Sequence, residues 1–204
     1  MNDYLPAALD SHAERMAKKK AARDRMMAGK TDDKGLLIIH TGTGKGKSSA
    51  AFGMVLRCIG HGLQSGVVQF IKGAWDTAER RVLSGFPDLV TFLAMGEGFT
   101  WETQDRSRDI ALASRAWAAA KAMLADPAYR MVVLDELNVV LRYEYLALDT
   151  VTAALSARPP GQHVVITGRN APVPLVETAD LVTEMTLIKH PFRKGIKAQA
   201  GVEF

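Results

Sequence analysis

The sequence predicts an α/β protein with a mostly parallel sheet flanked by helices. Short apolar runs alternate with helical stretches from Leu36 onward, and apolar runs of that length are typical of buried strands. Parallel strands need crossover connections, which the helical stretches supply. The chain has 204 residues, 48% of them apolar, so it is long enough to bury a sizeable core.

The expected elements follow one another in a regular order. The segments predicted to be strands are Leu36–His40, Gly66–Ile71, Val90–Ala94, Met131–Leu134, His163–Thr167 and Leu181–Leu187. Helices are expected over Lys47–Ile59, Thr77–Ser84, Gln104–Leu124 and Thr150–Ala157. Asp149 is expected to cap the last of these helices, and Pro159-Pro160 to follow its end.

Residues 1–34 are predicted to be a charged, helical N-terminal arm, and residues 35–204 the α/β domain. Asp10–Met27 mixes basic residues with Ala and Met and contains no Gly or Pro, which favours a solvated helix. Gly29–Gly35 is typical of a linker. Two interpretations stay open: a charged, partly frayed arm, or a lid or arm that covers a partner subunit.

Composition limits the function classes. The net charge of +4 and the pI near 9.2 suit an anionic ligand but are too mild to indicate nucleic-acid binding. Cys58 is the only cysteine, so the chain has no disulfide framework, and we expect a small core residue there. No signal-peptide pattern or membrane-length apolar window occurs, which predicts a cytoplasmic protein without a membrane partner.

The most informative segment is Thr41–Ser49, between the first strand and its following helix. Its three glycines let the backbone curl so that the loop amides and the helix N-terminus face an anion together. Lys47 would neutralise phosphate oxygens, and the Ser48 hydroxyl would bind magnesium. The predicted nucleotide-binding residues are Gly42, Thr43, Gly44, Lys45, Gly46, Lys47, Ser48 and Ser49. This phosphate loop, together with the alternation of strands and helices, predicts a P-loop NTPase-like (RecA-like) fold.

The loop departs from the usual phosphate-loop pattern. Thr41 stands where a glycine is expected five residues before Gly46, and Lys45 adds a second cation. Either change could alter how a triphosphate chain lies in the loop, so the motif predicts the ligand without fixing its orientation.

A second nucleotide signal follows the strand Met131–Leu134. Asp135 and Glu136 should emerge at the carboxyl edge of the sheet, beside the phosphate loop. One carboxylate can hold Mg²⁺ (or Mn²⁺), and the other can orient it. The predicted metal ligands are Ser48 and Glu136, with Asp135 as an alternative ligand or as a residue that supports them.

Phosphate loops serve several reactions, so the motif alone leaves alternatives open. The chain has no Asn-Lys-x-Asp segment, which argues against a GTPase. A generic ATPase or small-molecule kinase, and a non-catalytic module that binds nucleotide or corrinoid, remain as rival functions.

Several segments resemble the phosphate-loop type of ATP:cob(I)alamin adenosyltransferases. The matching stretches are GTGKGKSSAAFG (Gly42–Gly53), Gly60-His61-Gly62, GVVQFIKG (Gly66–Gly73), GFTWETQ (Gly98–Gln104), MVVLDEL (Met131–Leu137), VITGR (Val165–Arg169), Lys189-His190 and Lys197-Ala198-Gln199. They run in order from about Gly35 to Phe204, and the family shares the missing first glycine of the loop.

The resemblance implies transfer of the 5′-deoxyadenosyl group of ATP to cobalt(I) of a reduced corrinoid, with release of triphosphate. Cob(I)yrinic acid a,c-diamide and cob(I)alamin both stay open as the acceptor. The resemblance further implies that ATP lies reversed in the loop, that a reduced flavoprotein donates the electron, and that the protein is a homodimer.

The resemblance also assigns roles to particular residues. Lys47 would stabilise the leaving triphosphate, Arg57 would lie near the nucleoside, and Phe99 and Trp101 would border the corrin ring and exclude the lower axial ligand of cobalt. Within the matching stretches, Thr43 replaces the usual asparagine, and Arg169–Val176 is unusually rich in proline.

Overall fold

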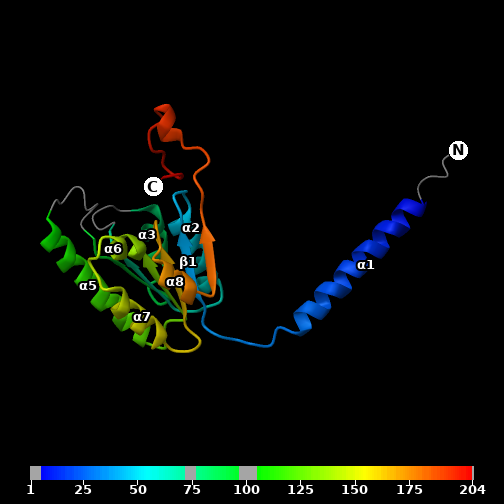
Figure 1. Ribbon diagram of the computed structural model, residues 1–204, viewed down its shortest axis with the longest axis horizontal. Coiled ribbons are helices and arrows are strands. Elements are labelled where there is room, and N and C mark those ends of the chain that lie inside the picture. Colours follow the sequence, from blue (N-terminus) through cyan, green and yellow to red (C-terminus); the bar gives the residue numbers. More distant parts are fainter. Residues whose placement is uncertain (1–5, 72–76, 97–104, 204) are drawn as a thin grey trace. The chain divides into compact units, whose positions relative to one another are not determined.

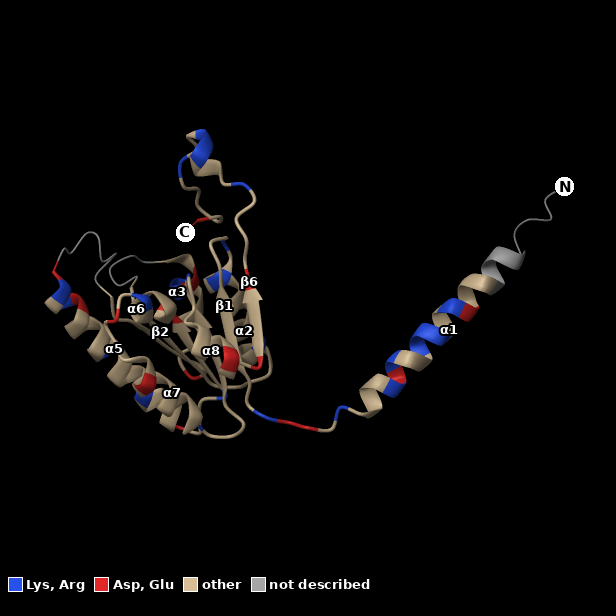
Figure 2. Cartoon of the chain, in the orientation of Figure 1, with Lys and Arg blue, Asp and Glu red and all other residues tan. Residues whose placement is uncertain are grey.

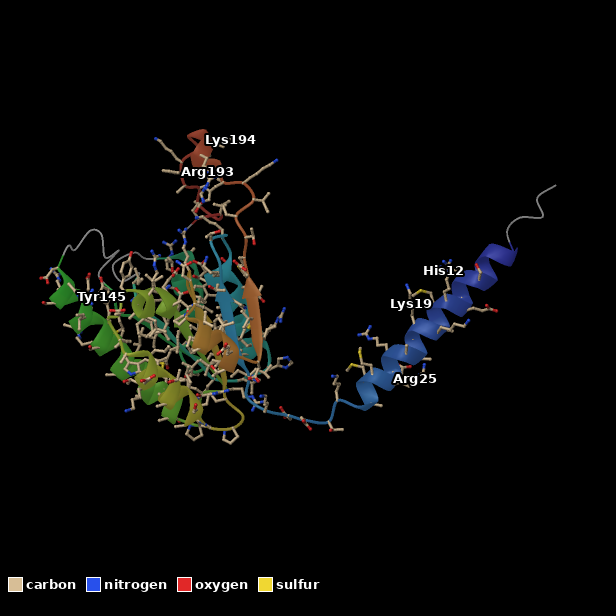
Figure 3. All side chains as sticks on the ribbon, in the orientation of Figure 1. His12, Lys19, Arg25, Tyr145, Arg193 and Lys194 are labelled. Carbon is tan, nitrogen blue, oxygen red and sulfur yellow. The ribbon has the colours of Figure 1, made fainter. Side chains whose placement is uncertain are left out.

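The computed structural model describes residues 6–71, 77–96 and 105–203. The chain divides into two compact units, Met1–Asp33 and Lys34–Phe204. The first unit contains α1 (Pro6–Ala28), which includes the predicted helix and begins four residues before it. Lys and Arg recur along α1 (Figure 2), and Figure 3 shows His12, Lys19 and Arg25 projecting from it. Residues 11–33 are exposed throughout.

The second unit is built on a six-stranded sheet with the order β3-β2-β4-β5-β1-β6. Its strands are β1 (Leu37–Thr41), β2 (Ser65–Gln69), β3 (Val90–Ala94), β4 (Met131–Asp135), β5 (His163–Thr167) and β6 (Leu181–Glu184). Every neighbouring pair in this sheet is parallel. The predicted α/β class and the P-loop NTPase-like fold are therefore confirmed.

Helices cover both faces of the sheet (Figure 1). One face packs on α2 (Lys47–Gly60) and α3 (Ala78–Leu83). The other packs on α5 (Arg106–Ala125), α6 (Leu137–Arg142), α7 (Leu148–Ser156) and α8 (Val173–Thr178).

Strand side chains alternate between these two layers. In β1, Leu37 and Ile39 belong to the core under α5 and α7, whereas Ile38 belongs to the core under α2. Because successive side chains of a strand point to opposite faces, a strand buried on both sides is mostly apolar. Cys58 is buried in the α2 core, as predicted.

Some sequence predictions of local structure were wrong. The last helix before β5 begins at Leu148, so Asp149 lies in its first turn instead of capping it. Helices α6 and α8 were not predicted, and β6 ends three residues earlier than expected. Leu137–Arg142 is too short and too rich in β-branched residues to show a helical period.

The start of β1 is held by a carboxylate that follows α8. Asp180 accepts hydrogen bonds from Lys34 Nζ at 2.5 Å and from the backbone N–H of Leu37 at 2.9 Å. These bonds favour the charged carboxylate, so they lower the pKa of Asp180 below its ordinary value, the Lys34 bond contributing most.

Beyond β6 the chain forms the 3₁₀ turn η1 (Pro191–Lys194), on which Figure 3 shows Arg193 and Lys194. None of the helices in the described ranges is long and apolar enough to cross a membrane.

Candidate nucleotide and metal site

The carboxyl ends of the parallel strands meet at one edge of the sheet and border a cavity of about 1100 Å³. That volume is slightly above the usual range of about 300–1,000 Å³ for small-molecule sites. Its polar floor comes from the phosphate loop and the strand ends, and includes Gly44, Lys45, Gly46, Lys47, Ser48, Ser49, Gln69 and Glu136. Lys45–Ser49 and Glu136, which were predicted from two separate segments, thus border one cavity.

The phosphate loop is shaped by glycines that approach the chain beyond β6. Gly44 N–H donates to the carbonyl of Met185 at 2.5 Å. A side chain at Gly44 would bring its Cβ within 2.6 Å of that oxygen, so only glycine fits. Gly42 and Gly46 have φ values of 93° and 102°, a conformation that favours glycine. The curled loop therefore depends on its glycines for both shape and clearance.

Lys47 is the buried cation of the loop. Its side chain is 7% exposed, and Nζ donates to the carbonyls of Gly42 at 3.0 Å and Gly44 at 2.6 Å. The backbone carbonyl of Lys47 accepts from Nδ1 of the buried His40, at 3.2 Å. The ammonium group is thus held inside the loop curve, where a phosphate oxygen would meet it.

Asp135 and Glu136 have different environments at the end of β4. Asp135 is fully buried, and its carboxylate accepts from Gln69 Nε2 at 2.8 Å and from Thr167 Oγ1 at 2.7 Å. Glu136 borders the cavity and adopts a left-handed backbone conformation with φ 64°. Its N–H donates to Thr167 Oγ1 at 2.9 Å. Glu136 is therefore half-buried at the edge of the cavity, whereas Asp135 is fully buried and bonded to two protein side chains.

The cavity offers oxygen donors that suit a small divalent cation. Ser48 and Glu136 both border it, next to the loop that would carry phosphate oxygens. In the described ranges, no group of three His, Cys, Asp or Glu side chains could hold a metal ion on its own. This donor set fits Mg²⁺, which binds one or two protein oxygens and completes its shell with substrate phosphates and water.

The remaining wall is largely apolar and carries two further arginines. Its apolar residues are Phe52, Leu56, Ile71, Val82, Leu83, Val139 and Val202. Arg142 and Arg169 also border the cavity, from the end of α6 and from the chain after β5. The wall therefore offers apolar surface with two cationic side chains, as is usual in sites for small molecules.

The C-terminal segment contributes to the same cavity. Ala198, Gly201, Val202 and Glu203 line it, and the Glu203 carboxylate forms an ion pair with Lys45 of the phosphate loop. Residues near the two ends of the α/β domain therefore meet over the phosphate loop.

Aromatic residues after α6 join the cavity to α5. Tyr143 lines the cavity and stacks on Tyr145, with ring centroids 5.6 Å apart. Tyr145 Oη donates to Asp109 of α5 at 3.2 Å. Burial and the adjacent Asp109 charge raise the pKa of Tyr145, which Figure 3 labels beside α5.

The predicted site residues are distributed unevenly over this surface. Gly42 and Thr43 are not among the residues that line the cavity, although the Gly42 carbonyl binds Lys47. Arg57 is exposed, ten residues along α2 from Lys47 and so about 15 Å away along the helix axis; it does not line the cavity either. Phe99 and Trp101 lie outside the described residues.

Sequence reasoning assigned no role to several residues that build the site. Gln69, Thr167 and Arg169 were noted only as parts of matching stretches, and Glu203 had no predicted role. The rule that predicted Asp135 and Glu136, that residues at parallel strand ends share one edge, applies equally to Gln69 and Thr167.

The fold and site together define a phosphate-loop α/β protein of the NTPase-like class. The model of the family described as ATP:corrinoid adenosyltransferase BtuR/CobO/CobP matches residues 33–204, and the chain belongs to this family of transferases.

Curated relatives carry corresponding names. A corrinoid adenosyltransferase of Pseudomonas aeruginosa is 58% identical over 193 residues, covering 95% of both chains. One from Sinorhizobium sp. is 58% identical over 203 residues, covering 98% of this chain and 95% of the relative. A corrinoid adenosyltransferase of Salmonella typhimurium is 46% identical over 195 residues, covering 96% and 98%.

Proposed function

We propose that this protein transfers the 5′-deoxyadenosyl group of ATP to cobalt(I) of a reduced corrinoid, with tripolyphosphate as the leaving group. The electron pair of cobalt(I) forms the cobalt–carbon bond to C5′. The C5′–oxygen bond breaks, and its electron pair leaves with the triphosphate. The observation that carries the proposal is the shared cavity, in which a phosphate loop and a carboxylate face a large apolar wall.

The protein's task is to bind and orient, because cobalt(I) is itself a strong nucleophile. Lys47 and the loop amides would hold the triphosphate and stabilise the charge that develops as it departs. Lys45 would add a second cation once its carboxylate partner Glu203 yields to phosphate. No activated side-chain nucleophile is needed in this reaction.

Ser48 and Glu136 would hold Mg²⁺, and Asp135 would support Glu136 through Thr167. The bound cation would supply charge neutralisation for the triphosphate. Both ligands border the cavity, whereas both oxygens of Asp135 already accept hydrogen bonds. We therefore propose direct ligation by Ser48 and Glu136 and a supporting role for Asp135.

The finer assignments follow from the family. Phe99 and Trp101 would border the corrin, and Arg57 would contact the nucleoside. A reduced flavoprotein would supply the electron, and the enzyme would work in the cytoplasm as a homodimer. Residues 1–34 would form a charged helical arm, and residues 35–204 the adenosyltransferase domain.

An anaerobic assay with ATP, Mg²⁺ and chemically reduced cob(I)alamin tests the reaction. We expect equal amounts of the light-sensitive adenosyl–cobalt product and of triphosphate, abolished by Lys47→Ala. Lys121→Ala is the matched control, because Lys121 is exposed on α5 and does not line the cavity. Orthophosphate or ADP without a cobalt–carbon bond would instead indicate a generic ATPase, and binding of both ligands without turnover would indicate a binding module.

A further inference from the structure

Three adjacent strand ends are linked by buried hydrogen bonds beneath the cavity. Gln69, Asp135 and Thr167 are the last residues of β2, β4 and β5. Gln69 Nε2 donates to Asp135 Oδ2 at 2.8 Å, and Thr167 Oγ1 donates to Asp135 Oδ1 at 2.7 Å. Their exposed fractions are 1%, 0% and 0%, so the network is buried, and Gln69 is its member that borders the cavity.

The directions of these bonds are determined by chemistry. Thr167 Oγ1 accepts from Glu136 N–H, so its single hydrogen must point to Asp135. A carboxylate only accepts, so Gln69 must present its amide nitrogen to Asp135. The amide of Gln69 therefore cannot be reversed, and the position of its carbonyl oxygen is fixed.

That carbonyl oxygen is a hydrogen-bond acceptor without a donor in the described part of the chain. Gln69 Oε1 is buried and has no hydrogen-bond partner among the described residues. Buried polar groups are nearly always paired, and an orphaned one calls for an explanation. Gln69 also lines the cavity, together with Ser48 and Glu136.

The ligand chemistry at this point narrows the choice of donor. At neutral pH a triphosphate chain presents acceptors almost exclusively, so it cannot satisfy Gln69 Oε1 directly. A water molecule bound to Mg²⁺ is a polarised donor, and Mg²⁺ usually keeps several such waters. Gln69 donates a hydrogen bond to Asp135, and the next residue in the chain is the proposed metal ligand Glu136.

We propose that Gln69 is a positioning residue for the metal's hydration shell, its Oε1 accepting a hydrogen bond from a water bound to Mg²⁺. This inference rests on the proposed Mg²⁺ site at Ser48 and Glu136. Gln69 thus orients Asp135 through its nitrogen and the hydrated cation through its oxygen. Outer-shell partners of this kind are known to change metal affinity by about 10- to 100-fold.

The test is calorimetric binding of ATP to the full chain, in Mg²⁺ and in EDTA. Gln69→Met keeps the length of the side chain and removes its polar atoms. We expect it to weaken binding of ATP with Mg²⁺ by about tenfold, and to change binding in EDTA by less than about twofold. Gln64→Met is the control, because Gln64 is exposed and lies just before β2. Should Gln69→Met fail to fold by circular dichroism, Gln69→Leu serves in its place.

Equal weakening in Mg²⁺ and EDTA, or no weakening at all, would overturn the role of Gln69. A ribose hydroxyl is the other donor to distinguish. If it were the partner, 2′- or 3′-deoxy-ATP would bind the wild-type protein more weakly than ATP does and the Met variant equally well, which also overturns the proposal. Failure of the underlying metal site gives a different result: wild-type affinity for ATP would not depend on Mg²⁺, and Glu136→Gln would change nothing.

Discussion

Thr167 connects the two carboxylate residues at the end of β4. Replacing it should show how much that connection contributes to stability and to ATP binding. Its hydroxyl donates to Asp135 Oδ1 and accepts from the Glu136 N–H, at 2.7 and 2.9 Å. Thr167→Val keeps the branched shape and removes only the hydroxyl. Two groups, a carboxylate oxygen and a backbone N–H, would then lose their partner inside the protein.

The expected magnitude follows from those two lost partners. A buried polar group that loses its hydrogen-bond partner costs about 1–3 kcal/mol, and Asp135 keeps its second oxygen bonded to Gln69. We expect Thr167→Val to lower the free energy of unfolding by roughly 2–5 kcal/mol. For a domain of this size, that corresponds to a fall in melting temperature of roughly 4–20 °C.

Thr167→Ser is the matched control, because it keeps the hydroxyl and loses only a methyl group. Its expected cost is about 1 kcal/mol. The assay is urea denaturation of both variants without ligand, followed by ATP binding with Mg²⁺. If the Val variant is as stable as the Ser variant and binds ATP equally well, the hydroxyl does not hold Glu136 in place, and the reasoning is refuted.

Three further outcomes are expected elsewhere in the domain. Asp180→Asn should flatten the acid side of the stability profile: the lowered pKa means that the stability from Asp180 is present above about pH 4 and is lost as the pH falls through the folded-state pKa. Urea denaturation across pH 2.5–6 checks this, and an unchanged acid side would contradict it. Gly44→Ala should weaken ATP binding at least about tenfold, because its Cβ would collide with backbone beyond β6. Gly53→Ala, with open space around its Cβ in α2, should be neutral or stabilise by up to about 1 kcal/mol; equal calorimetric affinities for the two variants would count against the collision. Glu203→Gln removes the carboxylate that pairs with Lys45. Calorimetry should therefore show that triphosphate binds the variant a few times more tightly than it binds the wild-type protein. Weaker binding would contradict competition between Glu203 and phosphate for Lys45.

The fold was predictable because its signals are local. Strands β1, β2, β4 and β5 are almost entirely buried and are therefore mostly apolar, and each of the six strands in the described ranges overlaps a predicted one. The helices that were missed lack such a signal. Val173–Thr178 has a proline at its start and only six residues, and its place is determined by Leu175 packing beneath the sheet.

The site was predictable only where one segment carries its whole chemistry. The phosphate loop is contiguous, and its glycines and Lys47 act within a few residues of each other. The network under the cavity joins residues from three strands, and Gln69 meets Asp135 only because β2 and β4 are neighbours in the sheet. Strand order is a tertiary property, so no spacing along the chain could reveal that contact.

At Glu136, tertiary contacts override the local backbone preference of the residue. A left-handed conformation at a residue with a side chain costs about 1–3 kcal/mol and persists only where its surroundings impose it. Here Thr167 holds the N–H of Glu136, and Gly168 leaves room beside its carboxylate, since a Cβ there would come within 3.2 Å of Glu136 Oε2. Gly168 itself has φ 126°, which a side chain would strain further. Residues at the end of β5 thus maintain the left-handed conformation of Glu136 at the end of β4. Glu136 is also the residue proposed to bind the metal. A strained conformation that neighbouring residues maintain at the edge of a cavity is typical of a functional site.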